Sequence, residues 1–152
     1  MSLSISEVDQ LITKADNHGA KFMENCHPKN KGLWKSRAAR SSDVVIVNKT
    51  KFHFKLTSES KSSGVWTEEM LPVSDINPKR SVLFGCQSRG FMTGCTECCV
   101  SYKSKCGNAE FTVYTSNPFV GAKHAGAKFA SNVTVATNLG QQNNNMVCFT
   151  VT

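Results

Sequence analysis

The cysteines are the first residues whose type and spacing suggest chemistry. The 152-residue chain has seven, and three of them stand in Cys95-Thr96-Glu97-Cys98-Cys99. Cysteines this close together are typical of zinc sites. The stretch from Cys95 to Tyr102 has the pattern of a strand, in which neighbouring side chains point to opposite faces. Cys95 and Cys98 would then diverge, and Cys95 and Cys99 would lie roughly 13 Å apart. We therefore expect no metal, with Cys98 in the core and Cys95 and Cys99 on the other face.

Histidines are the second set of residues that could carry chemistry. They are scattered along the chain and stand in no nucleophile or metal motif: His18, His27, His53 and His124. A cysteine and a histidine can still meet in the fold without any local signature. The sequence nevertheless favours a protein that is not an enzyme, and it predicts no cofactor.

The positive charge is concentrated in one stretch of the chain. The formal net charge is +7, and residues 27–55 contain eight bases against one acid. Such a patch suits an anionic surface, either nucleic acid or lipid headgroups. No nucleic-acid-binding motif accompanies it, and few aromatic residues are interleaved with the bases. We expect no nucleic-acid partner, and a solvated linker remains the simplest alternative.

The first 26 residues have the pattern of an amphipathic helix. Ser4 and Glu7 fit a capping box. Apolar residues then recur at helical spacing along one face, among them Ile5, Val8, Ile12 and Phe22. Pro28 ends this pattern. Residues 27–42 follow as a polar, basic connector that contains Trp34.

From residue 43 onward the sequence has the pattern of several short strands. Val44 to Val47 form a β-branched run, and Phe52, Phe54 and Leu56 alternate with polar residues. Further candidate strands are Ser81 to Cys86, Cys95 to Tyr102, Glu110 to Thr115, Asn132 to Thr137 and Met146 to Val151. Turn residues separate them. This predicts an all-β protein: a compact antiparallel β-sandwich over residues 43–152, preceded by the N-terminal amphipathic helix over residues 1–26 and the connector over residues 27–42.

The order of signals from Ser62 to Gly121 resembles a known superfamily. Ser63-Gly64 precedes Trp66, Thr93-Gly94 precedes a strand that leads to Tyr102, and a later strand ends in Ser116-Asn117-Pro118-Phe119. This order resembles the actinoporin-like pore-forming cytolysins and the similarly sized aegerolysin-like proteins. The resemblance implies a β-sandwich that binds membrane lipid, with phosphocholine or a sphingolipid headgroup as the ligand. It also implies pores formed by self-assembly or with a protein partner, and cytolysis or haemolysis as the outcome.

The resemblance also implies residue roles. The headgroup site would consist of Ser63, Thr96, Ser116, Pro118 and Phe119. Aromatic residues interact favourably with a choline ammonium and with membrane interfaces, and the candidates are Trp34, Trp66, Tyr102 and Tyr114. The helix that enters the bilayer would use Ile5, Val8, Ile12 and Phe22. Alternatively, that face packs on the sandwich, and the turn residues serve only as a turn.

One departure from the pattern keeps a second function open. The actinoporin pattern has a cluster of Trp and Tyr after the Pro-aromatic turn, whereas Gly121 to Lys128 contains no aromatic residue. The alternative is a non-lytic binding module, lectin-like or protein-binding. No signal peptide opens the sequence, which suggests secretion by a non-standard route or a cytoplasmic protein that associates with membranes when it acts.

Overall fold

The computed structural model describes residues 2–4, 40–67, 70–88, 96–118, 120–130, 132–139 and 144–152. Its strands, in chain order, are β1 (Ser2–Ser4), β2 (Ser41–Asn48), β3 (Phe54–Ser63), β4 (Val65–Trp66), β5 (Asp75–Ile76), β6 (Arg80–Gln87), β7 (Thr96–Ser104), β8 (Glu110–Asn117), β9 (His124–Phe129), β10 (Val135–Leu139) and β11 (Asn144–Val151). The described part of the chain contains no helix.

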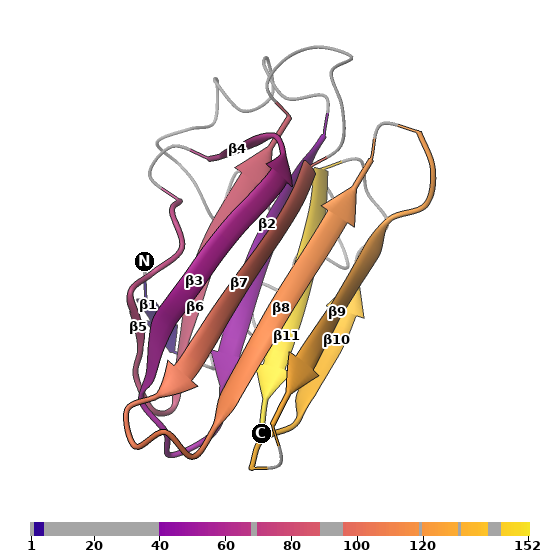
Figure 1. Cartoon of the computed structure of the whole chain (residues 1–152). Helices are drawn as coiled ribbons and strands as arrows, with labels where there is room; N and C mark the ends of the chain where they lie inside the picture. Colours follow the sequence, from indigo (N-terminus) through magenta and orange to yellow (C-terminus); the bar gives the residue numbers. More distant parts are fainter. Residues whose placement is uncertain are drawn as a thin grey trace.

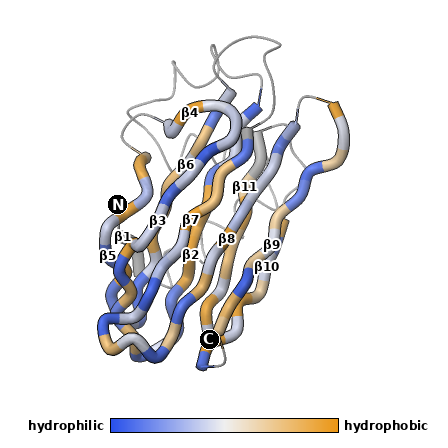
Figure 2. Tube along the Cα trace, viewed as in Figure 1, coloured by the Kyte–Doolittle hydropathy of each residue, from blue (hydrophilic) through white to orange (hydrophobic). Residues whose placement is uncertain are grey.

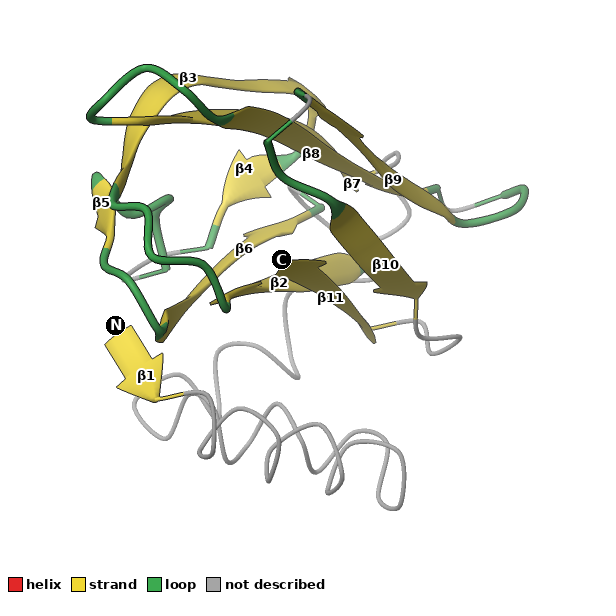
Figure 3. Cartoon of the chain, turned by 90° about the horizontal axis from the view of Figure 1, so that it is seen from below, coloured by secondary structure: helices red, strands yellow, loops and turns green. Residues whose placement is uncertain are grey.

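The strands form two sheets that pack face to face (Figures 1 and 3). One sheet, which we call sheet A, has the order β1-β6-β2-β11-β10, and β4 also pairs with β6. The other, sheet B, has the order β5-β3-β7-β8-β9. Neighbouring strands are antiparallel except β2 and β11, which run parallel. The predicted all-β sandwich is confirmed, with one parallel pair added to its antiparallel sheets.

The core lies between the sheets and follows the alternation of side chains along each strand. In β8 the buried residues are Phe111, Val113, Thr115 and Asn117, while the residues between them are at least partly exposed. Aromatic rings fill the centre. The rings of Phe54 and Phe111 lie 4.9 Å apart edge to face, and Tyr102 stacks on Phe111 at 5.6 Å. Such pairs stabilise a core beyond the area that they bury.

Strand β2 is buried on both of its faces. Val44 and Ile46 belong to the core between the sheets, and Val45 and Val47, which point the other way, are equally buried. Asp43 is also fully buried, and neither of its carboxylate oxygens has a hydrogen-bond partner among the described residues. Burial without compensating contacts raises the pKa of Asp43 well above its ordinary value.

The N-terminal prediction needs one correction. Ser2–Ser4 form strand β1, which pairs antiparallel with β6, so the predicted helix cannot extend over residues 2–4. Residues 5–39 lie outside the described residues, and with them Ile5, Val8, Ile12, Phe22 and Trp34. At the other end of the connector, β2 begins at Ser41 rather than at residue 43. Within the described residues, no helix has the length and apolar character needed to span a bilayer.

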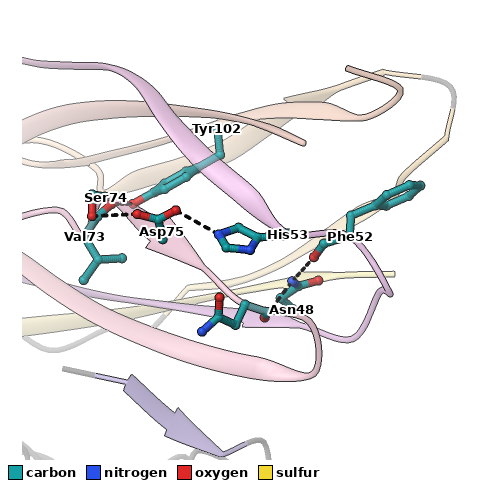
Figure 4. A network of polar contacts seen from close by, with 8 residues as sticks. Asn48, Phe52, His53, Val73, Ser74, Asp75 and Tyr102 are labelled. Carbon is teal, nitrogen blue, oxygen red and sulfur yellow. Dashed lines mark hydrogen bonds and ion pairs between the residues drawn. The ribbon is translucent and has the colours of Figure 1, made fainter. Parts of the chain in front are cut away.

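A network of polar contacts ties the loop between β2 and β3 to its surroundings (Figure 4). The side-chain nitrogen of Asn48 donates to the carbonyls of Phe52 and Asn77, at 2.9 and 3.0 Å. Its oxygen accepts from the amide and the hydroxyl of Thr50. Asn48 is fully buried, so it satisfies the polar groups of two turns. Hydrophilic residues gather in the turns at this lower end of the sandwich (Figure 2).

Candidate functional site

Two of the predicted headgroup residues come together on sheet B. In the strand register, Ser63 of β3 lies opposite Glu97 of β7, and Glu97 lies opposite Ser116 of β8. Ser116 in turn lies opposite His124 of β9. These four residues therefore form one row across four adjacent strands, and Glu97 separates the two predicted serines.

Glu97 organises the polar groups around it. Its carboxylate accepts hydrogen bonds from the hydroxyls of Ser62 and Ser116, the latter at 3.3 Å. Around it lies a shallow groove of about 310 Å³, which we call the Glu97 groove. Its outward-facing lining comprises the side chains of Ser60, Ser62, Glu97, Cys99, Tyr114 and Ser116. The serine of β3 that reaches Glu97 is thus Ser62, the neighbour of the predicted Ser63.

The Glu97 groove has the chemistry of a site for a cation. A carboxylate at its centre attracts a positive group and repels a phosphate. The ring of Tyr114 adds a π face, which attracts ammonium groups. The hydroxyls supply further acceptors. The groove therefore suits the ammonium end of a zwitterionic ligand better than its phosphate end.

The position of Tyr114 depends on a glycine in the neighbouring strand. Tyr114 of β8 lies opposite Gly126 of β9, and a Cβ atom added at Gly126 would lie 2.6 Å from Cζ and 2.9 Å from Cε1 of the tyrosine ring. The ring therefore lies directly over the backbone of Gly126. Tyr114 is still 43% exposed, so its outer face is open to a ligand.

We expect the substitution Gly126→Ala to displace the Tyr114 ring. The new methyl group cannot occupy the space of the ring, so the ring must rotate towards solvent, at a cost of about 1–3 kcal/mol in the free energy of unfolding. Denaturant unfolding measures this cost. Lys128→Ala is a control in the same strand, because it also introduces an alanine, at an exposed position that does not lie beneath the ring. Unchanged stability, with unchanged Tyr114 fluorescence, would contradict the placement of the ring.

The other predicted headgroup residues are less well placed. Thr96 is the first residue of β7 and lies opposite Asn117, next to the row of Glu97. Pro118 follows β8 and is half-buried. Phe119 lies outside the described residues. The structure thus brings Ser63, Thr96, Ser116 and Pro118 to one end of sheet B, and only Ser116 of these lines the groove.

Two aromatic candidates have roles within the fold. Tyr102 is fully buried and its hydroxyl donates to the carbonyl of Val73 at 2.8 Å, so this membrane candidate is corrected to a core residue. Tyr102 lies on the same face of β7 as the buried Cys98 and Val100, which is the inner face. Trp66 is half-buried at the open edge of the sandwich, where it packs against Phe84, and Lys61 Nζ lies 5.8 Å from its ring centre. Among the aromatic candidates that the structure describes, Tyr114 alone lines the Glu97 groove.

Glu97 is the site residue that sequence reasoning missed. The sequence places it inside the cysteine-rich segment, where the cysteines and Thr96 were given a possible role but Glu97 was not. A signal was available: Glu97 and Cys99 share a face of the predicted strand, opposite Cys98. The partners of Glu97 come from β3 and β8, however, and only the strand register reveals them.

The cysteines occupy both faces of the sheets. Cys98 is buried, as expected, and Cys99 is half-buried on the outer face. The thiol of Cys98 contacts that of Cys86, and this contact together with burial raises the pKa of Cys86. The five cysteines that the structure describes form no disulfide. Among the described side chains, no group of three His, Cys, Asp or Glu residues is arranged to hold a metal ion.

A serine, a histidine and an aspartate meet elsewhere, in the polar network of Figure 4. His53 Nε2 lies 2.8 Å from Asp75 Oδ1, and Ser74 Oγ donates to Asp75 Oδ2 at 2.9 Å. These two contacts hold the pKa of Asp75 below its ordinary value. In a catalytic triad the imidazole stands between the other two groups. Here the carboxylate does, so the arrangement does not activate Ser74 as a nucleophile.

Comparison with known proteins places the fold. The fold of the present chain is similar to that of Nakanori. The match to the crystal structure of this lipid-binding protein has a TM-score of 0.71 and covers 95% of the present chain and 85% of Nakanori. The two sequences are 11% identical over the match, so the likeness is one of fold. No protein-family model matches the chain, and neither does any curated protein sequence.

Proposed function

We propose that this protein binds membrane lipid and that the Glu97 groove receives the headgroup. The observation that carries the proposal is the groove itself: a carboxylate, a tyrosine ring and three serine hydroxyls on one sheet face. The fold that presents it is similar to that of the lipid-binding protein Nakanori, which supports a lipid as the ligand. The ligand would be a zwitterionic headgroup, phosphocholine or that of a sphingolipid.

The chemistry assigns an orientation to this headgroup. The choline ammonium would lie between Glu97 and the exposed face of Tyr114, where charge attraction and cation–π attraction act together. The phosphate would lie away from Glu97, because like charges repel. Ser62 and Ser116 hold the carboxylate in place, so both act as positioning residues.

The substitution Glu97→Gln tests the headgroup assignment. We expect it to weaken binding to vesicles of sphingomyelin or phosphatidylcholine by about tenfold, since a charged contact to an ammonium is worth about 1.4 kcal/mol or more. Binding to vesicles is measured by flotation or surface plasmon resonance. The matched control is Glu59→Gln, which changes the same charge at an exposed position of β3 outside the groove. Equal weakening by both substitutions would reject the Glu97 groove as the headgroup site.

Pore formation is the second part of this proposal. The amphipathic pattern of residues 5–26 motivates it, because such a face suits the membrane interface or the wall of a water-filled pore. Such a pore would need several copies of the chain or a second protein. Dye release from sphingomyelin-containing liposomes tests it, and Ile12→Lys should abolish release while binding persists. Binding without release by the unaltered chain would favour the non-lytic binding module.

A further inference from the structure

A second groove lies on the same outer face of sheet B, below the Glu97 groove. Ser58 of β3, Ser101 of β7, Thr112 of β8 and Lys128 of β9 lie opposite one another in a row across the four strands. This row lines a shallow groove of about 550 Å³, which we call the Ser101 groove. The volume falls within the range of small-ligand sites in proteins. In Figure 1 these strands form the front layer of the molecule.

Hydroxyl-bearing side chains are the most numerous in the lining of the Ser101 groove, which also includes the exposed ring of Phe129. Ser101 Oγ lies 2.6 Å from Thr112 Oγ1, and Thr57 Oγ1 donates to the carbonyl of Ser101 at 3.1 Å. A hydroxyl has one donor and two acceptor sites, so each of these groups retains capacity for a ligand. They are held on neighbouring strands of sheet B, whose pairing fixes their mutual positions.

The charges of the Ser101 groove are balanced. Glu110 and Lys128 both line it, and both are exposed. One carboxylate and one ammonium leave no net charge to attract a phosphate or a sulfate. An acyl chain is equally unsuited, because covering hydroxyls with apolar groups removes their water without replacing its hydrogen bonds. The remaining ligand class is neutral and rich in hydroxyls.

We propose that the Ser101 groove binds a neutral sugar. Ser58, Ser101 and Thr112 would exchange hydrogen bonds with sugar hydroxyls, Glu110 would accept them, and Lys128 would donate them. The sugar can belong to a glycolipid headgroup or to a free oligosaccharide, and the recognition chemistry is the same. This site is separate from the headgroup site, because no residue lines both grooves.

Two measurements distinguish the sources of the sugar. In the first, the chain is applied to an array of neutral, sialylated and sulfated glycans. In the second, it is added to phosphatidylcholine vesicles with and without lactosylceramide. The second measurement is made in the Glu97→Gln background, so that the increment due to lactosylceramide does not depend on the headgroup site.

The test variant is Thr112→Val, which removes a hydroxyl and keeps the β-branched shape that suits a strand. Its matched control is Thr137→Val, at an exposed position of β10 in the other sheet. We expect Thr112→Val to weaken the binding of neutral glycans about tenfold, and Thr137→Val to leave it unchanged. Ser101→Ala should repeat the loss. Binding on the array identifies a free oligosaccharide, and binding to lactosylceramide vesicles alone identifies a glycolipid.

Three results would overturn the sugar site. They are the absence of neutral glycan binding in both measurements, a preference for sialylated or sulfated glycans, and equal binding by the Thr112→Val and Thr137→Val variants. None of them affects the proposed lipid function, which depends on Glu97→Gln and on vesicles without glycolipid. Conversely, loss of the headgroup site leaves the lactosylceramide increment intact.

Discussion

Replacing Asp43 with asparagine is expected to remove a loss of stability that the protein suffers as the pH rises above about 4. Asp43 is fully buried in β2 and neither oxygen has a hydrogen-bond partner in the part of the chain that the structure describes, so its neutral form is favoured in the folded chain. In the unfolded chain it ionises near its ordinary value of 3.8. Above that pH the folded state binds one more proton than the unfolded state.

The sign follows from this proton count. Stability from Asp43 is complete below the unfolded pKa and is lost as the pH rises towards the folded pKa, at about 1.4 kcal/mol per pH unit at most. The Asp43→Asn variant has no proton to lose at this position. The free energy of unfolding of the variant, minus that of the unaltered chain, should therefore increase as the pH rises. Chemical unfolding at a series of pH values measures this difference.

Asp75→Asn is the control for the effect of Asp43. The contacts of Asp75 with His53 and Ser74 lower its pKa, so Asp75 contributes stability above its unfolded pKa and loses it as the pH falls through the folded value. The two substitutions should thus change the pH profile in opposite directions. A profile that Asp43→Asn leaves unaltered would mean that Asp43 is solvated or paired in the folded chain.

The second large effect is expected at Asn48. Asn48→Ala should lower the free energy of unfolding by about 2–4 kcal/mol, because it removes a fully buried side chain that is the partner of two carbonyls and an amide. Denaturant unfolding measures the loss. The turns that contain Phe52 and Asn77 would no longer be joined through the Asn48 side chain. The contact between His53 and Asp75 lies beside them (Figure 4).

Asn132→Ala is the matched control for Asn48→Ala. Both asparagines begin an Asn-x-Thr triplet, but Asn132 is exposed and donates only to the carbonyl of Asn108. Its replacement should cost less than about 1 kcal/mol, as is usual for exposed positions. Equal losses at the two positions would show that the buried contacts of Asn48 contribute little.

Several strands were predictable because their side chains alternate. The predicted strand Glu110 to Thr115 became β8, Glu110–Asn117, and Ser81 to Cys86 became β6, Arg80–Gln87. Strand β9 was missed. Its sequence, His-Ala-Gly-Ala-Lys-Phe, has small residues where a strand normally has β-branched ones. One of them, Gly126, accommodates the ring of Tyr114, a requirement that comes from the neighbouring strand.

The site was predictable only in part. The resemblance assigned Ser63 and Ser116 to one headgroup site, and in the strand register both lie opposite Glu97. It could not show that Glu97 separates them, nor that Ser62 makes the hydrogen bond. The β-bulge between Lys61 and Ser63 shifts the pairing of β3 by one residue, and such a shift changes which serine points outward.

The sequence by itself determined the class of this fold, since alternation and turn residues are local properties that survive without any partner strand. It also determined that Cys98 belongs to the core and that Cys99 lies on the other face. Tertiary structure alone decided the parallel pairing of β2 with β11, the burial of Asp43 and the two grooves on sheet B. The physical reason is that register and sheet order depend on contacts between residues far apart in the chain, and a one-residue shift exchanges the buried and the exposed face.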